Sequence, residues 1–575
     1  MKSEKNLVLA GAAGMGIQTV ESLFVNAAKQ SGLFVFASRE YMSRVRGGIN
    51  STAMRISSRP VRAFKERIDL LIPLSDLAIP HLKQRIRKNT IILGEKAFLN
   101  ADPTVKFTSI EVPFTDMATK IGNKIYANII ALGILAYIFK VNKTIVLGLI
   151  AEQFWKKGDK IIEENQNAIE KGYEMGKKLE LTNPILKNFE ITKNPQIIND
   201  LILDGTQAIG LGAIAGGCNY ETFYPMAPST GIGTFLAQNA LKFGIIVDQS
   251  EDEISVINKA LGASFAGARS LVTTSGGGFS LMSEGISLAG IMELPIVIVV
   301  GMRPGPATGM PTRTSQEDLE LILHAGAGFF PRIIFSPGTI EDAFYLTQQA
   351  FNLTQEFQVP VFILTDQYLV DSYYNLPSLD LEKLKIEKHI VKTVDNYNRY
   401  VFAVSSISPR GIPGYGNGLV NADSHTHDEQ GTITEDPVLR SRMVKKRLHK
   451  LELIQKASIL PEFIGNRNKY KILVVSWGSN YYLIKEALEI INREDIGFLH
   501  FKQVYPLHAM QIIQYLNKAN LIIAVEQNPT GQFAELLEKE THIPIDCRIL
   551  KFSGYTFSVE ELVEEIIHHV DKGAR

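Results

Sequence analysis

Residues 218–231 read CNYETFYPMAPSTG, and this stretch decides the fold of the middle of the chain. An apolar run typical of a buried strand leads into a turn with two prolines, each of which fixes φ and removes a backbone donor. Ser229, Thr230 and Gly231 follow as candidate N-caps of a helix. A stiff turn at the carboxyl end of a strand is where α/β folds bind ligands. The residues that we expect to line a ligand here are Tyr224, Pro225, Pro228, Ser229 and Thr230.

The same alternation of strands and helices extends to both sides of this turn. The runs GIIVDQ, SLVTTS, PIVIVVG and PVFILTD predict further strands of the same block, and NLVLAG, LFVF, LLIPLS and NTIILG predict an N-terminal α/β block with a largely parallel sheet. KILVVSWGS and LIIAVEQN begin a third block, after a basic helix, RSRMVKKRLHK. We predict an α/β protein with domains at 1–181, 197–450 and 455–575, in which 182–196 is a linker and the Gly- and Pro-rich segment 376–440 wraps over its neighbours.

Composition limits the functions open to the chain. It has 575 residues, of which 45% are hydrophobic, with 60 Lys and Arg against 60 Asp and Glu, so we expect no nucleic-acid or anionic membrane partner. The two cysteines, Cys218 and Cys547, cannot form a disulfide framework or a four-thiolate cluster, and a reducing cytoplasm fits best. The start of the chain has some features of a signal peptide but continues into an amphipathic helix pattern, and the apolar run 125–139 is too short to span a bilayer.

A glycine-rich turn near the N-terminus is a candidate phosphate site. Gly11, Gly14 and Gly16 follow a predicted strand and open a helix, where backbone N–H groups favour an anion. Their spacing differs from the dinucleotide fingerprint, so a tight turn at a domain interface is an equally good interpretation. Arg44 and Arg46, together with Arg55, flank Gly47-Gly48, and they either bind a phosphorylated cofactor such as coenzyme A or form salt bridges at the surface.

Two other polar segments contain residue types that can carry chemistry. Residues 421–429, NADSHTHDE, contain metal-binding residue types, but the spacing matches no zinc pattern, and we expect a solvated loop without a metal. In QSEDEISVINKALGASFAGAR, 249–269, Glu253 precedes a helix rich in small residues. This segment resembles the one with which thiamine-diphosphate enzymes present a glutamate to the aminopyrimidine ring of the cofactor.

Several motifs together resemble one family over nearly the whole chain. YPMAPST and the Glu253 segment are followed, in order, by TTSGGGFSLMSEGISLAG, MRPGPATGMPTRTSQEDL, PVFILTDQYLVDS, SPRGIPGYG and EQNPTGQ. The series is similar to the α subunit of 2-oxoacid:ferredoxin oxidoreductases, with a γ-type domain fused ahead of a pyrimidine-binding domain and a transketolase-C-terminal-like domain. The form with this fusion is often associated with 2-oxoglutarate.

The resemblance implies roles for particular residues. Glu253, with Glu251 as the alternative, would hydrogen-bond the aminopyrimidine of thiamine diphosphate, a role that needs a carboxylate in an apolar setting. Arg303 would bind the carboxylate of the 2-oxoacid, with Thr312 as a second contact. Many relatives have a threonine where this chain has Ala227, so a hydroxyl near the substrate is missing.

The implied reaction needs a second subunit. The chain contains no Gly-Asp-Gly, which the family uses to hold Mg²⁺ and diphosphate, and it has too few cysteines for a [4Fe-4S] cluster. A separate β subunit is expected to carry these, in an αβ heterodimer or (αβ)₂. The implied activity is oxidative decarboxylation of a 2-oxoacid to acyl-CoA and CO₂ with ferredoxin as acceptor. 2-Oxoglutarate is the first expectation, pyruvate or branched-chain acids the next, and a non-catalytic scaffold, suggested by Ala227, is the alternative of another class.

Overall fold

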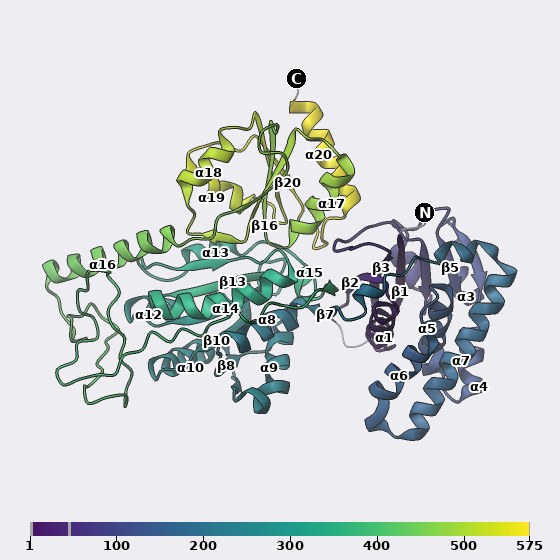
Figure 1. Ribbon diagram of the computed structural model, residues 1–575, viewed down its shortest axis with the longest axis horizontal. Coiled ribbons are helices and arrows are strands. Elements are labelled where there is room, and N and C mark those ends of the chain that lie inside the picture. Colours follow the sequence, from purple (N-terminus) through teal and green to yellow (C-terminus); the bar gives the residue numbers. More distant parts are fainter. Residues whose placement is uncertain (1–3, 44–47, 574–575) are drawn as a thin grey trace. The chain divides into compact units, whose positions relative to one another are not determined.

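The computed structural model describes residues 4–43 and 48–573, and the chain separates into two compact units (Figure 1). The first unit contains Met1–Leu203, Asp371–Leu379 and Ser558–Glu560, and the second contains the remaining residues. Both units combine β-sheets with helices, as the sequence predicts. Since Arg44 and Arg46 lie outside the described residues, their predicted role stays a prediction.

The first unit is built on an eight-stranded sheet. In spatial order its strands are β6 (Thr108–Glu111), β5 (Ile91–Gly94), β4 (Leu70–Pro73), β1 (Glu4–Ala12), β3 (Ile49–Ser57), β2 (Phe34–Glu40), β14 (Tyr373–Leu376) and β7 (Leu201–Asp204). The pairs β1–β4, β4–β5 and β5–β6 are parallel, whereas β1–β3, β2–β3 and β2–β14 are antiparallel. The prediction of a largely parallel sheet was therefore wrong, because β3 returns antiparallel between β1 and β2.

Helices complete the core of this unit. They are α1 (Ile17–Gln30), α2 (Ala78–Leu82), α3 (Lys96–Leu99), α4 (Phe114–Ile121), α5 (Ala127–Ile138), α6 (Lys143–Phe154) and α7 (Asp159–Thr182). The apolar run 125–139 forms α5, which packs closely on α7: a Cβ at Gly172 would lie 2.2 Å from the carbonyl oxygen of Ile130. Among residues 4–43 and 48–573, no helix combines the length and the apolar character that crossing a bilayer requires.

A seven-stranded sheet forms the centre of the second unit. Its spatial order is β18 (Gln503–Tyr505), β12 (Ile333–Phe335), β13 (Pro360–Asp366), β11 (Ile296–Met302), β10 (Ser270–Ser275), β8 (Tyr220–Phe223) and β9 (Ile246–Gln249). Every neighbouring pair is parallel except β12–β18. The strands β10, β11 and β13 are entirely buried, as expected for parallel strands covered on both faces.

Helices cover both faces of this sheet. They include α8 (Gly205–Ala215), α9 (Thr230–Phe243), α10 (Glu253–Phe265), α11 (Gly276–Ser280), α12 (Ser283–Ile291), α13 (Leu319–His324), α14 (Ile340–Phe357) and α15 (Gln367–Val370). The glycines of α8 let its backbone approach α14, since a Cβ at Gly212 would lie 2.4 Å from the carbonyl oxygen of Phe344. The small-residue pattern in this segment thus has a packing role.

A five-stranded sheet completes the second unit. It contains β15 (Glu462–Ile464), β17 (Ile496–Phe501), β16 (Ile472–Trp477), β19 (Leu521–Glu526) and β20 (Cys547–Leu550), with α17 (Tyr481–Ile491), α18 (Ala509–Leu516), α19 (Gln532–Thr541) and α20 (Val559–Gly573) following its strands along the chain. One hydrophobic core joins residues of this sheet, such as Trp477, with residues of α10 and α12. The seven-stranded and five-stranded sheets share this core and belong to one compact unit. The domain boundary near residue 450 therefore stays a prediction.

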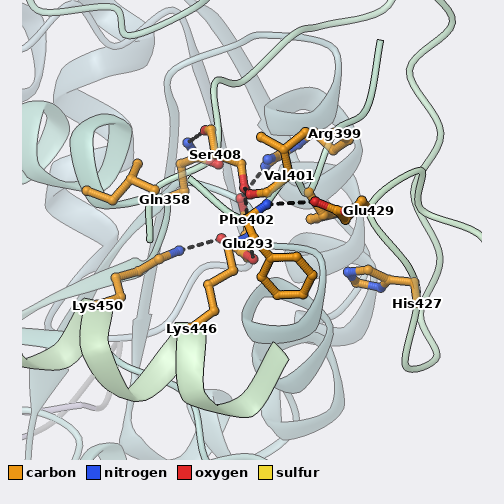
Figure 2. Close-up of polar contacts among 12 residues, drawn as sticks. Glu293, Gln358, Arg399, Val401, Phe402, Ser408, His427, Glu429, Lys446 and Lys450 are labelled. Atoms are coloured by element: carbon orange, nitrogen blue, oxygen red, sulfur yellow. Dashed lines mark hydrogen bonds and ion pairs between the residues drawn. The ribbon is translucent and has the colours of Figure 1, made fainter. Parts of the chain in front are cut away.

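Residues 377–436 form neither helix nor strand and lead into α16 (Pro437–Lys456), beside which their loops are drawn in Figure 1. On α16, Lys446 and Lys450 form ion pairs with Glu293, at 2.8 Å and 2.5 Å, and all three side chains are at most 3% exposed (Figure 2). These ion pairs hold α16 against the residues that precede β11, at the amino-terminal edge of the sheet. His427 is 2% exposed and stacks on Tyr400, so the predicted solvated loop is in fact partly buried.

Candidate active site

The carboxyl ends of four parallel strands bring the predicted site residues to one edge of the seven-stranded sheet. The turn 224–229 follows β8, the glycines 276–278 follow β10, Arg303 follows β11, and α10 begins at Glu253 shortly after β9. Because the strands are parallel, segments that lie up to 80 residues apart meet at this edge.

The turn after β8 is held close to β11. Arg303 donates from Nη1 to the carbonyl oxygen of Ala227 at 2.7 Å, and a Cβ at Gly301 would lie 2.9 Å from Pro228. Ser229 occupies the N-cap position of α9, but its hydroxyl donates to the carbonyl of Met226 and does not cap the helix. Tyr224 is 39% exposed and Thr230 is half-buried. The turn therefore presents main chain to Arg303 and an aromatic side chain to solvent.

The two competing glutamates occupy different environments. Glu253 is the first residue of α10 and is 4% exposed, and its Oε1 is buried without a hydrogen-bond partner in the described part of the chain. Glu251 has a side chain 71% exposed that lies 3.7 Å from Lys259, and hydrogen bonds to its carboxylate lower its pKa. A buried carboxylate oxygen without a partner fits a bound donor such as a ring nitrogen, so the site suits the aminopyrimidine group that the family motifs imply.

Three consecutive glycines, Gly276 to Gly278, leave space for two carboxylates, those of Glu253 and Asp318. A Cβ at Gly278 would lie 2.5 Å from Oε1 of Glu253, and one at Gly276 would lie 2.2 Å from Oδ1 of Asp318. These glycines belong to the sequence motif TTSGGGFS. Its glycines have a specific physical purpose, because any side chain at 276 or 278 would displace a carboxylate.

Asp318 was not predicted from the sequence. Its Oδ2 is buried and has no hydrogen-bond partner among the described residues, although the residue as a whole is partly exposed. Burial, with a contribution from Glu317, raises the pKa of this carboxyl to about 7, while Arg303 opposes the shift. Asp318 and Arg303 are thus electrostatically coupled within one site, and no local pattern around Asp318 would have indicated it.

The loop 303–318 is anchored to the five-stranded sheet through Gln316. The backbone N–H of Gln316 donates to Gln527 at 2.7 Å, and its side chain bonds Trp477 and Asn480. Thr312 is 8% exposed within this loop. The Arg303 guanidinium keeps a buried Nε that has no partner in the described structure, so it retains a donor for a ligand carboxylate.

A second carboxyl that sequence reasoning missed lies inside the sheet. Glu221, on β8, is completely buried, and its Oε1 accepts a hydrogen bond from Thr273 at 3.4 Å. Burial raises its pKa to about 8, so this carboxyl is largely protonated at neutral pH. Glu221 lies on β8, the strand that leads into the turn 224–229, so this strand carries a neutral carboxyl.

The N-terminal glycine turn belongs to the first unit. Gly16 is the N-cap of α1 in the left-handed region, with φ of 72°, and Gly14 has φ of 88°. The side chain of Asn128 donates to the carbonyl of Met15 at 2.7 Å and closes the turn. Arg55 is buried on β3 and pairs with Glu4, with 3.0 Å between Nη2 and Oε1, so it stabilises the sheet and does not belong to a phosphate cluster.

Comparisons with known proteins find two family models that match this chain. Residues 211–446 match the family model described as pyruvate flavodoxin/ferredoxin oxidoreductase, thiamine diphosphate-binding, and residues 6–175 match that of pyruvate ferredoxin/flavodoxin oxidoreductase. The α/β fold and these two family models together define a subunit of an oxidoreductase with a thiamine diphosphate-binding domain.

Relatives of full length make the assignment specific. The chain is 30% identical to a 2-oxoacid:ferredoxin oxidoreductase subunit alpha of Sulfolobus sp, covering 99% of this chain and 97% of that one. It is 31% identical to the 2-oxoglutarate synthase subunit KorA of Archaeoglobus fulgidus, over 63% of this chain and 97% of that protein. The solved 2-oxoglutarate:ferredoxin oxidoreductase from Magnetococcus marinus superposes with a TM-score of 0.92 at 27% identity, covering 99% of this chain and 100% of the other. The chain belongs to the family of 2-oxoacid:ferredoxin oxidoreductase α subunits, which confirms the family and the α/β fold class predicted from its motifs.

Proposed function

We propose that this chain, together with a separate β subunit, catalyses the CoA-dependent oxidative decarboxylation of a 2-oxoacid, with ferredoxin as the electron acceptor and acyl-CoA and CO₂ as products. The observation that carries the proposal is the buried, unpartnered Oε1 of Glu253 on the carboxyl edge of the parallel sheet, stated for the described residues. Thiamine diphosphate, when bound, supplies the nucleophilic carbon that attacks the 2-oxo group.

The burial of Glu253 and its place at the start of α10 support a role in proton sharing with the cofactor. Its carboxylate lies at the entry of α10, against Gly278. An oxygen that is desolvated and lacks an internal partner gains most from a ring N–H, and that hydrogen bond shifts the proton balance of the pyrimidine ring. Glu251, which is exposed and lies near Lys259, has no comparable need for a ligand.

Arg303 is suited to binding the substrate carboxylate. One of its nitrogens is fixed by the main-chain carbonyl of Ala227, and this orients the guanidinium without using its other donors. Because the contact is to main chain, it survives any residue type at 227. The lost threonine hydroxyl therefore affects the space beside the substrate and not the anchoring of Arg303. Thr312, in the same loop, remains the proposed second contact.

The metal and cluster ligands that this chain lacks indicate which cofactors a partner subunit would hold. The sequence lacks Gly-Asp-Gly and holds two cysteines, so we assign Mg²⁺, the diphosphate contacts and the [4Fe-4S] cluster to the β subunit. For the substrate, 2-oxoglutarate ranks first. It is supported by the Archaeoglobus fulgidus relative and by the Magnetococcus marinus structure, which has 2-oxoglutarate, coenzyme A and succinyl-CoA bound. Pyruvate and branched-chain acids rank next.

Co-expression with the β subunit tests the proposal. The single chain should be colourless, inactive and weak in thiamine diphosphate binding. The complex should be brown and should reduce ferredoxin only when a 2-oxoacid and coenzyme A are both present. A panel of 2-oxoacids assayed at equal concentration would rank the substrates. Iron–sulfur absorbance from the single chain would refute the division of cofactors, and an assembled, cofactor-loaded complex without turnover on any acid would support the scaffold alternative.

A further inference from the structure

Arg410 lies in the segment SPRGIPGYG, on the amino-terminal side of the second unit's core, and is 3% exposed. Its Nε, Nη1 and Nη2 are all buried, and none has a hydrogen-bond partner among residues 4–43 and 48–573. A guanidinium stays charged in proteins and has five N–H donors. An arginine that buries all of its nitrogens without a protein acceptor therefore requires an acceptor of another kind.

The backbone around Arg410 is held firmly. Its carbonyl accepts from the N–H of Val391 at 2.9 Å, and the hydroxyl of Tyr397 bonds both neighbours, donating to Pro409 and accepting from Gly411 at 2.6 Å each. Ile412 packs over Gly267, at the end of α10. Hydrogen bonds thus fix the main chain at Arg410. The guanidinium itself stays out of solvent because all three of its nitrogens are buried.

The charges that surround this guanidinium are also positive. Burial, with smaller contributions from Arg399 and Arg269, lowers the pKa of Arg410 to about 9, and these two arginines are themselves 3% and 6% exposed. Arg269 donates to neutral oxygens of Gly216, Glu387 and Asn352, and Arg399 donates from Nη2 to the main-chain carbonyl of Glu293, leaving a buried Nη1 with no partner in the described chain.

The buried carboxylate of Glu293, whose main-chain carbonyl binds Arg399, is already paired. Both oxygens of Glu293 bind lysines of α16 (Figure 2), so its single negative charge, which also attracts Arg399, is shared among three cations. The carboxylate of Glu387 is half-exposed and lies 3.3 Å from His389. Buried charges in proteins are normally paired, and this arginine cluster has more positive charge than the carboxylates described around it can compensate.

We propose that Arg410, with Arg399 and Arg269, forms an internal site for a small inorganic anion of the size of chloride. A water molecule would satisfy the N–H donors but not the charge, whereas an anion satisfies both. The enclosure of Arg410 selects a small ion over an extended ligand. The anion links the segment 390–416 to Arg269 and so to the end of the helix that begins at Glu253, which makes it a structural ligand of the domain that carries the candidate active site.

Bromide is the direct probe of this site. Crystals of the full-length chain, alone or in its complex, are grown with bromide in place of chloride, and anomalous scattering is measured at the bromine edge. The expected result is a peak within hydrogen-bonding distance of the Arg410 guanidinium. Density there without an anomalous signal would identify water and overturn the proposal.

Anion-dependent unfolding gives an independent test in solution. Chloride is titrated at constant ionic strength against the salt of a bulky organic sulfonate, and the unfolding midpoint should rise and saturate in the wild type. Arg410→Met should abolish this dependence, and Arg410→Lys should shift it to higher chloride because the planar fork is lost.

Arg332→Met is the matched control, since Arg332 is also buried, at 5%, but donates to the carbonyls of Ile322 and Ala325. This variant should be destabilised and keep the chloride dependence. An equal response to chloride in the Arg410→Met and Arg332→Met variants would contradict the proposal, as would a wild type that does not respond. Should Arg410→Met fail to fold, the bromide measurement on the wild type decides alone.

Discussion

Glu253 and Glu293 are two buried glutamates of the second unit, 4% and 3% exposed, which differ in their hydrogen bonding. Glu293 bonds two buried lysines, and their charges hold its pKa well below the usual range. Glu253 leaves one oxygen without a partner in the described structure, on the opposite edge of the sheet. Burial alone therefore does not distinguish a structural carboxylate from a functional one. The state of its hydrogen bonds does, because a fold pairs the charges it buries for its own stability.

Glu293→Gln should produce the largest loss of stability. The substitution leaves Lys446 and Lys450 as uncompensated buried charges, and breaking such a pair costs about 3–5 kcal/mol. Thermal or urea unfolding should show a much lower midpoint than for the wild type, whereas Glu253→Gln, the matched change at the unpaired carboxylate, should change the midpoint little. Equal destabilisation by both substitutions would remove the distinction between the two glutamates.

Arg303→Ala should weaken use of the 2-oxoacid. Losing a charge-assisted hydrogen bond costs about 1.5–3 kcal/mol, which should appear in kcat/KM for the acid. The KM for coenzyme A serves as the internal control and should remain nearly unchanged. Arg303→Lys should rescue part of the loss, since the charge returns without the fork. If both substrates suffer equally, Arg303 acts on the fold and not on the acid.

Glu221→Gln should stabilise the protein at alkaline pH. The folded pKa of Glu221 is about 8, above its ordinary value of 4.5, so the folded state holds an extra proton between these values and the wild type loses stability as pH rises through this window. The neutral glutamine avoids that loss, and the gain should reach about 1 kcal/mol or more at pH 8. Unfolding measured from pH 5 to pH 9 checks this, with exposed Glu251→Gln as the control. A constant difference across that range would contradict it.

Ala227→Thr should leave the stability of the protein nearly unchanged and test substrate specificity. The carbonyl that binds Arg303 is retained, so only the space beside the substrate changes. A hydroxyl or methyl change in a pocket alters discrimination by about 1–3 kcal/mol at most. The ratio of kcat/KM between competing 2-oxoacids should shift, and a parallel change for every acid would show that position 227 is passive.

The sequence predicted the long buried strands of the second unit because their apolar runs are continuous, and it predicted α16 from its basic residues. It missed β3, whose INSTAMRIS pattern is polar, since the burial of Arg55 there depends on partners elsewhere in the chain, among them Glu4, 51 residues away, and the carbonyl of Ala63. Short strands such as β12 and β14 carry too few residues to show a pattern. Asp318 and Glu221 escaped for a related reason: their shifted pKa values come from burial by distant segments. The spacing that favoured Glu253 over Glu251 was a family likeness, and the burial of Glu253 is the physical condition that this role requires.

Hydrogen–deuterium exchange at C2 of thiamine diphosphate, measured in the assembled complex, tests the role of Glu253 most directly, because it separates cofactor activation from substrate binding and electron transfer. Glu253→Gln should slow the exchange by about 10²-fold or more, since the amide cannot share a proton with the pyrimidine ring. Glu251→Gln should leave the exchange near the wild-type rate. Loss of exchange in Glu251→Gln with normal exchange in Glu253→Gln would contradict the assignment, and normal exchange in both would show that this chain does not activate the cofactor.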